Sequence, residues 1–388
     1  MKTRVKESTM VKPMEETLSG NLWLSNIDLV LSETHHTRCI YLYRCDGGAK
    51  TNNDNGRIEI NCNGEGVSFV EAECDGTLDE LGEFCNPRPD LSLAPTVDYS
   101  KGISTFLLFL INVLNRFKCG GATLGFANEH HTSDEISGNN SINTWTAIAR
   151  GLTTVPHVSL DRRVLAARNP RNPSSPHIEH HPPPPSKTHL LNSGGDTTFS
   201  TFRLSRDHIN ALKQKCNDNS NYTMYEVVAG HVWRCVSIAR GLPRDQETKL
   251  QLPVDLPQGY FGNGIFYTCA FALIGELVSK PLKFAVEKKV HDAIARMDDE
   301  YLRPALDYLE LHLQNGEGIV RTQNHVKCPN FGIMSWVRLS VHKAEFGLGK
   351  PVFVGAGEAL SEGKSFLYPN QASRCTNNVA VRKRKSVT

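Results

Sequence analysis

The chain has 388 residues, of which 39% are hydrophobic and 22% charged, and its formal net charge is +2. This length exceeds what one hydrophobic core usually supports, and the small net charge argues against a nucleic-acid-binding protein. The most apolar stretch, residues 103–114, is shorter than the about 20 residues that a membrane-spanning helix needs, and residues 1–7 lack the apolar run of a signal peptide. The 11 cysteines show no CxxC pairs, which favours reduced thiols in a cytosolic protein over disulfides or a zinc site.

Hydrophobic periodicity predicts the elements of the first half. Residues 103–114 predict a buried strand, and the alternating run Lys118–Glu129 predicts a second one. A helix is expected after the polar stretch 135–140, because apolar residues then recur at helical spacing, at Ile142, Trp145, Ile148 and Ala149. Residues 130–134, His-His-Thr-Ser-Asp, therefore lie on a strand-to-helix connection, where reactive groups often occur.

A proline-rich segment separates this half from the next. Residues 169–194 are too rich in proline to form a helix, so we expect a linker between a lobe at 1–168 and a lobe at 195–388. Four histidines lie in or beside it, but without a cysteine or carboxylate pattern we expect no metal site there. The second lobe carries helical patterns at 206–215 and 283–297 and alternating runs at 264–271 and 332–341. Mixed strands and helices predict an α/β or α+β class.

His130 has the position and chemistry of a general base. A neutral imidazole at a strand end can take a proton from a substrate hydroxyl. His131 is expected to point the other way, because neighbours on an extended chain face opposite sides. Asp134 could orient the imidazole in a triad or serve a structural role.

Several motifs in chain order resemble those of the BAHD family of plant acyl-CoA-dependent acyltransferases. The first is HxxxD at His130–Asp134, and a DFGWG-like motif stands near the C-terminus. The branch resembled most closely transfers hydroxycinnamoyl groups to shikimate or quinate. The stretches that carry the resemblance are Val5–Val11, Asn21–Trp23, Tyr225–Glu226, Ala229–Trp233, Tyr260–Asn263, Lys327–Asn330, Ser335–Trp336 and Glu345–Gly349.

The resemblance implies a fold and an activity. It implies two similar lobes of mixed sheet flanked by helices, as in chloramphenicol acetyltransferase, with an active-site channel between them. His130 would be the base, and Asp134 would be structural, paired with an arginine of the other lobe. Trp336 would donate to the oxyanion, although a buried tryptophan of an amphipathic strand is an equal alternative. Arg321 would bind the acceptor's carboxylate.

Three further positions and the partners complete this picture. Thr37 and Tyr41 match acceptor-side positions, although an ordinary strand explains them equally well. Met334 also faces the acceptor and stands where the family has a threonine. The implied partners are hydroxycinnamoyl-CoA, as a co-substrate rather than a cofactor, and shikimate or quinate. We expect a monomer that binds neither nucleic acid nor membrane.

The sequence also departs from the family pattern. The Asp-Gly-Arg stretch that should supply the partner of Asp134 is missing, which predicts an unpaired carboxylate. Glu135 replaces the usual glycine after the motif. A first-lobe segment and the final helix are absent, which predicts exposed apolar surface near Ile58, Ile60 and Val379. These departures leave a second function open, that of a catalytically silent relative that only binds or interacts.

Overall fold

A computed structural model of the chain describes residues 2–17, 19–31, 36–40, 49–52, 58–77, 80, 93–119, 121–153, 158–174, 176–186, 197–216, 221–255, 259–315, 325–346, 349–357, 363–369 and 377–384. The chain divides into two compact units. The first comprises Met1–Ala166, Pro257–Gly264 and Arg338–Ala359, and the second comprises Ala167–Leu256, Ile265–Val337 and Leu360–Thr388. Two segments from the second half of the chain thus belong to the first unit. The predicted lobes, 1–168 and 195–388, were each continuous in sequence and did not include this.

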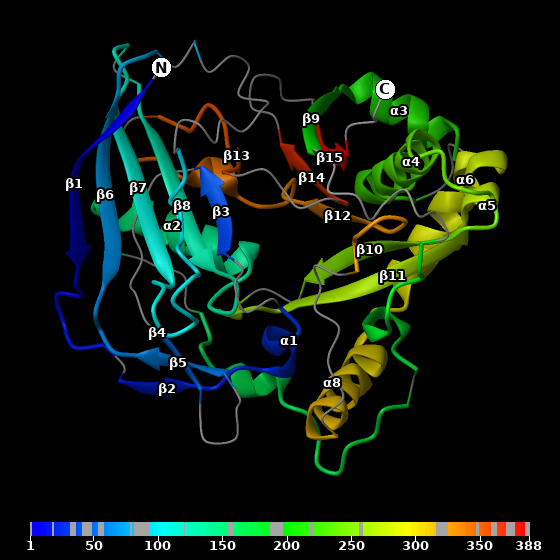
Figure 1. Cartoon of the computed structure of the whole chain (residues 1–388), viewed down its shortest axis with the longest axis horizontal. Helices are drawn as coiled ribbons and strands as arrows, with labels where there is room; N and C mark the ends of the chain where they lie inside the picture. The colour runs from blue at the N-terminus through cyan, green and yellow to red at the C-terminus, as the bar shows by residue number, and fades with distance from the viewer. Residues whose placement is uncertain are drawn as a thin grey trace. The chain divides into compact units, whose positions relative to one another are not determined.

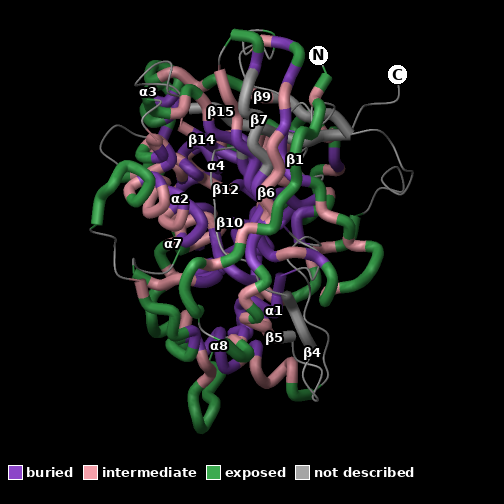
Figure 2. Tube along the Cα trace, turned by 90° about the vertical axis from the view of Figure 1, so that its left-hand side faces the viewer, coloured by how far each residue is buried: buried purple, intermediate pink, exposed green. Residues whose placement is uncertain are grey.

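A mixed sheet of six strands forms the centre of the first unit (Figure 1). In spatial order, its strands are β1 (Thr3–Val11), β6 (Val67–Cys74), β7 (Phe109–Arg116), β8 (Thr123–Glu129), β3 (His36–Ile40) and β13 (Gly355–Ala356). The pair β6 and β7 is parallel, and the other neighbours are antiparallel. The edge strand β1 is largely exposed (Figure 2). Strand β8, in the interior of the sheet, is buried after its first residue.

A small second sheet corrects one expectation about exposed surface. Its order is β2 (Gly20–Leu22), β5 (Ile58–Cys62) and β4 (Ala49–Asn52). The central strand places Ile60 opposite Leu22 on one side and Lys50 on the other, and Ile60 is only 5% exposed. The prediction of exposed surface at Ile60 is therefore wrong. The side chains of Ile58 and Val379 lie outside the described part of the structure.

The predicted strand–loop–helix around the HxxxD motif is confirmed. The strand is β8, which begins at Thr123 rather than at Lys118, and the helix is α2, Glu135–Ala149. The polar stretch 135–140, expected to precede the helix, forms its first turns because Asp134 caps it. Ile142 is buried on α2, whereas Ile148 is 55% exposed, so only part of the apolar spacing faces the core. The run 103–114 gives a strand only from Phe109 onward.

The second unit is also built on a mixed six-stranded sheet. Its order is β11 (Ile265–Leu273), β10 (Glu247–Asp255), β12 (Phe331–Ser335), β14 (Lys364–Pro369), β15 (Asn377–Arg384) and β9 (Thr197–Leu204). Strand β12 runs parallel to β10 and β14, and the remaining pairs are antiparallel. The alternating run at 264–271 therefore gives β11, but the run at 332–341 remains a strand only to Ser335.

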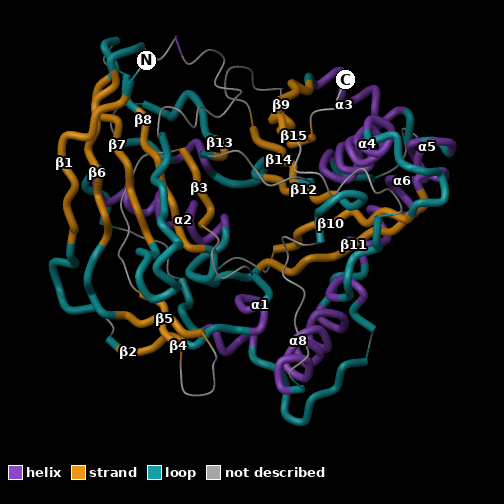
Figure 3. Tube along the Cα trace, viewed as in Figure 1, coloured by secondary structure: helices purple, strands orange, loops and turns teal. Residues whose placement is uncertain are grey.

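The helices of this unit gather on α4, Met224–Ala239 (Figure 3). The helices that contact α4 include α3 (Arg206–Gln214), α5 (Ile274–Ser279) and α6 (Leu282–Ala285). Helix α8 (Asp299–Gln314) comes after them in the chain. The predicted helix 283–297 continues from α6 through a π-helical turn, Val286–His291, into α7, Asp292–Ala295. At the contact, a methyl group on Gly230 of α4 would meet Val286 Cγ2 at 2.9 Å, so glycine permits the close approach.

The core of the second unit explains why α4 forms where it does. Thr223 and Glu226 form a capping box at its start, and its buried face includes Ala229 and Trp233. The Trp233 indole donates to Thr248 Oγ1 at 3.2 Å, which satisfies its only polar group inside the core. In the proline-rich segment, the described residues contain no α-helix, only a 3₁₀ turn at Ile178–His180. None of the helices in the described ranges is long and apolar enough to span a bilayer.

Candidate active site

The loop 130–134 connects the end of β8 to the start of α2 in the first unit. Its residues are deeply buried, with His130 3% exposed, His131 0% and Asp134 5%. The side-chain amide of Asn128, on β8, donates to the carbonyl of Ser133 at 3.0 Å and lies 2.9 Å from its hydroxyl. The loop is therefore closed on itself by a side chain of the strand that precedes it.

The two adjacent histidines have different carboxylate neighbours. His131 Nδ1 lies 2.7 Å from Glu129 Oε1, and the His131 backbone N–H donates to Glu129 Oε2 at 2.9 Å. Both side chains are fully buried. The His131 imidazole is thus tied to the strand end and serves as an anchor of the loop.

Arg162 is a buried arginine that the sequence analysis did not identify. Its two terminal nitrogens donate to the carbonyls of His131 at 2.7 Å and Thr132 at 2.6 Å, and its guanidinium lies 3.4 Å from Asp28 Oδ2. Asp28 belongs to the capping box of α1, Asn26–Leu29. The neighbouring Arg163 is exposed. No local sequence signal distinguishes the two arginines.

Asp134 is the N-cap of α2, and backbone amides satisfy its carboxylate. Oδ1 accepts from Ser137 N–H at 2.8 Å, and Oδ2 accepts from Gly264 N–H at 2.9 Å. The backbone N–H of Asp134 also donates to the Gly262 carbonyl at 2.9 Å. The expectation of an unpaired carboxylate is therefore wrong, because the segment Pro257–Gly264 of the first unit supplies an amide where an arginine was expected. Burial raises the pKa of Asp134, and the two amide bonds oppose this rise.

Glu135, the first residue of α2, is the carboxylate nearest to the candidate base. Its Oε1 lies 3.7 Å from His130 Nε2, and the two side chains are 17% and 4% exposed. Burial lowers the pKa of His130, but the hydrogen bond and charge of Glu135 outweigh burial and raise the pKa above its ordinary value. The carboxylate that acts most strongly on His130 is thus Glu135, and Asp134 has a weaker effect.

Strand β3 lies beside β8 and carries the acceptor-side candidates of the first unit. Thr37 pairs with Asn128, and Cys39 pairs with Phe126. Thr37 is half-buried, while burial raises the pKa of the Cys39 thiol, with Glu135 adding to the effect. Thr37 is therefore one strand away from the residue that closes the loop. Tyr41 lies outside the described residues.

The DFGWG-like segment packs against α2. The ring of Phe346 meets Trp145 edge-on at a centroid distance of 5.2 Å, and Asn143 donates to the Ser340 carbonyl at 3.3 Å. Gly347 and Leu348 lie outside the described residues. These contacts hold the returning segment Arg338–Ala359 to the helix that starts at Asp134, which agrees with a structural role for the motif.

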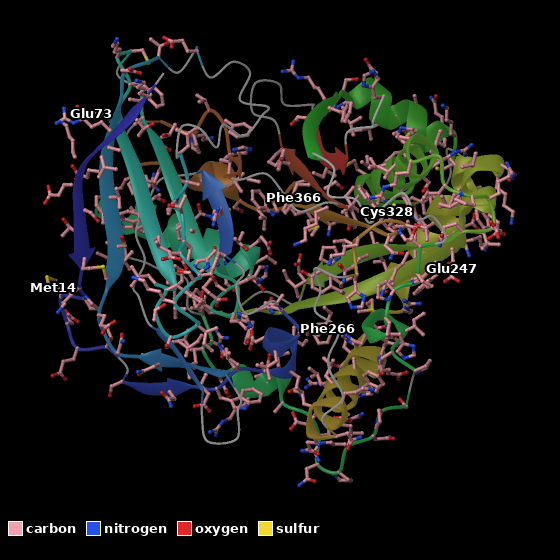
Figure 4. The ribbon with its side chains drawn as sticks, viewed as in Figure 1. Met14, Glu73, Glu247, Phe266, Cys328 and Phe366 are labelled. Atoms are coloured by element: carbon pink, nitrogen blue, oxygen red, sulfur yellow. The ribbon has the colours of Figure 1, made fainter. Side chains whose placement is uncertain are left out.

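Trp336 and Met334 belong to the second unit, at the end of β12. Trp336 is 3% exposed, and its ring contacts Phe366 at 5.2 Å and Tyr368 at 5.9 Å, both on β14 (Figure 4 labels Phe366). Its backbone N–H donates to the Leu367 carbonyl. Among the described residues, the indole Nε1 has no hydrogen-bond partner. Met334 is half-buried opposite Phe366. Arg321 lies outside the described residues.

The histidines of the proline-rich segment pack around an aromatic side chain. His177, His180 and His181 lie with ring centroids 5.3, 6.1 and 6.3 Å from Tyr308 of α8. His177 Nδ1 also lies 3.2 Å from Glu179 Oε1. Within the described ranges, no three His, Cys, Asp or Glu side chains converge so as to hold a metal ion.

Comparison with known proteins extends over nearly the whole chain. A family model described as the Transferase family matches residues 43–382. The chain is 44% identical to shikimate O-hydroxycinnamoyltransferase from Nicotiana tabacum, over 98% of this chain and 96% of that protein. It is 43% identical to rosmarinate synthase from Plectranthus scutellarioides, over 95% and 94%. The solved structure of F. graminearum TRI101 with coenzyme A and T-2 mycotoxin matches with a TM-score of 0.74 at 15% identity, over 95% of this chain and 96% of that one.

Proposed function

Because the chain belongs to the Transferase family of BAHD acyltransferases, we propose that it transfers a hydroxycinnamoyl group, p-coumaroyl or caffeoyl, from coenzyme A to a hydroxyl of shikimate or quinate. The observation that carries the proposal is the anchoring of the loop 130–134. His131 is held by Glu129, and Asp134 by two backbone amides. Because both of these neighbours are engaged elsewhere, we assign the proton transfer to His130.

His130 acts as the general base in this proposal. An alcohol is a poor nucleophile while protonated, so the imidazole takes the hydroxyl proton as the oxygen attacks the thioester carbonyl. A C–O bond forms, the carbonyl oxygen becomes an oxyanion, and the C–S bond then breaks. The imidazolium returns its proton to the thiolate of coenzyme A, so the enzyme ends the cycle unchanged.

Trp336 supplies the donor for the oxyanion in this proposal. A buried indole N–H normally has an acceptor, and within the described part of the chain that of Trp336 has none. Indole can only donate, so its unused capacity suits a negative oxygen that forms during the reaction. Loss of one such donor typically lowers kcat by about 10²–10³-fold.

Arg321 selects the acceptor in this proposal, and Thr37, Tyr41 and Met334 are the other acceptor-binding candidates. A guanidinium binds a carboxylate through two parallel hydrogen bonds, which a neutral alcohol cannot offer. Arg321→Ala should therefore raise KM for shikimate far more than KM for an uncharged alcohol. Arg163→Ala, at an exposed arginine, is the matched control and should change neither KM. Equal losses for charged and uncharged acceptors would assign Arg321 to the fold instead.

The direct test is to incubate the purified protein with p-coumaroyl-CoA and either shikimate or quinate, and to detect the ester by mass spectrometry. His130→Ala should lower turnover by about 10²–10⁴-fold while coenzyme A still binds. Ester formation that survives in His130→Ala would refute the assignment of the base.

A catalytically silent relative is the second candidate, and one residue of the described site favours it. Met334 offers no hydroxyl where the family has a threonine. Binding of coenzyme A without ester or free hydroxycinnamate in the assay above would select this candidate.

A further inference from the structure

Glu135 is the feature of the candidate site that the acyl-transfer mechanism does not use. It opens α2 and lies 3.7 Å from Nε2 of His130, yet it is not part of the helix cap, which Asp134 provides. Its side chain is only 17% exposed. A carboxylate at this distance from an imidazole in a protein interior interacts with the charged form of the ring much more strongly than it would in water.

The other charged groups around the loop are already engaged. On β8, Glu129 is bound to His131, and at the start of α2 the oxygens of Asp134 accept from two backbone amides. The guanidinium of Arg162 donates to loop carbonyls. Glu135 is thus the carboxylate whose charge is directed at His130.

Strand β3 packs against β8 and presents three titratable or charged residues. The ring of His36 lies 2.9 Å from the Tyr99 hydroxyl and 2.9 Å from the Leu107 carbonyl. Burial raises the pKa of Cys39, which keeps the thiol neutral, and Arg38 pairs through its backbone with Ala127. Glu135 and Asp134, rather than these three residues, are the charged side chains that raise the pKa of His130.

We infer that Glu135 is a positioning residue that holds a proton on His130 and thereby ties acyl transfer to more alkaline pH. The inference rests on the proposed role of His130 as the base. Two opposite effects follow from one carboxylate. At acid pH it keeps the imidazole in the charged form, which cannot accept the hydroxyl proton. At alkaline pH it strengthens the base and stabilises the imidazolium that forms in the transition state.

The pH profile of Glu135→Gln tests both effects at once. Glutamine keeps the size and helix propensity of the side chain and removes only its charge. Compared with the native protein, kcat of the variant should reach a lower plateau at alkaline pH, and its acid limb should lie at lower pH, with little change in KM for the acyl donor. Glu300→Gln, an exposed glutamate in the first turn of α8, makes the same change elsewhere and should leave the native profile in place.

A titration that needs no turnover separates this inference from the proposed function. The full-length protein is labelled at histidine, and the His130 imidazole resonance is identified by its loss in His130→Gln. The titration midpoint of His130 should be lower in Glu135→Gln than in the native protein and unchanged in Glu300→Gln. An unchanged or higher midpoint in Glu135→Gln overturns the inference even if the native protein makes ester. A lowered midpoint supports it even if no ester forms.

Discussion

Replacement of Asp134 tests whether its carboxylate has a structural or a catalytic role. The structure gives Asp134 two backbone donors, Ser137 N–H and Gly264 N–H, one on each oxygen. Asp134→Ala removes both acceptors. Asp134→Asn keeps one oxygen, which can still cap α2, but turns an amide toward the second donor.

The expected losses follow from these two bonds. Removal of an N-cap costs about 0.5–2 kcal/mol, and a buried N–H left without an acceptor costs about 1–3 kcal/mol. Asp134→Ala should therefore lower the free energy of unfolding by roughly 2–4 kcal/mol. Asp134→Asn should lower it by about 1–3 kcal/mol, because only the bond from Gly264 is lost. Asp299→Ala, at a highly exposed aspartate in the first turn of α8 that is not the cap, is the control and should change the stability by less than about 1 kcal/mol.

Urea unfolding followed by circular dichroism measures these losses, and the turnover of the folded variants completes the test. If a carboxylate orients a catalytic imidazole, its replacement by an amide lowers kcat by about 10⁴-fold. We expect folded Asp134→Asn to keep its turnover within about tenfold of the native value, because Asp134 bonds to backbone amides. Unchanged stability together with turnover lost by about 10⁴-fold would refute the structural role.

Three further changes probe the frame around the site and the second unit. Burial holds the pKa of His180 at about 4, below its ordinary 6.5. The contribution of neutral His180 to stability is therefore complete above about pH 6.5 and is lost as the pH falls toward 4. His180→Phe should reduce the acid-induced loss of unfolding free energy by up to roughly 3 kcal/mol, and an unchanged dependence of stability on pH between 7 and 4 would contradict this. Arg162→Lys should destabilise by about 2–4 kcal/mol, because one ammonium cannot serve both loop carbonyls, while Arg163→Lys should be neutral in the same urea titration. Gly363→Ala should lower the melting temperature and cost at least about 2 kcal/mol, since Gly363 has φ +83 and a methyl group would collide with the Val326 carbonyl; a native melting temperature would show that the turn can rearrange.

The local part of the site was predictable from the sequence. Alternation before residue 130 and helical spacing after it placed His130 on the connection between β8 and α2, as the structure has it. These patterns repeat over short distances along the chain, so they can be recognised without knowledge of the fold. The choice of His130 over His131 came instead from the first position of HxxxD, which the family resemblance supplies, and it stays a prediction.

The partners of the site residues were not predictable in the same way. Asp134 accepts a hydrogen bond from the backbone N–H of Gly264. Nearly every residue has such an N–H, so the sequence does not indicate which one makes the contact. Arg162 differs from Arg163 only in which one is buried, a consequence of the 3₁₀ turn that carries them. The position of Ile60 on a central strand, between β2 and β4, was likewise not predictable, because these strands are too short to show a period.

The place of β15 in the second sheet constrains how that unit can assemble during synthesis. Strand β9 opens the unit's sheet in chain order, but its only described strand neighbour is β15, much later in the chain. While the ribosome is still making the residues between them, β9 has no partner strand, and its backbone amides and carbonyls must remain hydrated or be covered by another protein. Closing so long a loop is slow, and an unpaired strand is prone to wrong pairing during that interval. A fusion that delays release of the C-terminal strand should therefore lower the soluble yield more than the same fusion placed at the N-terminus.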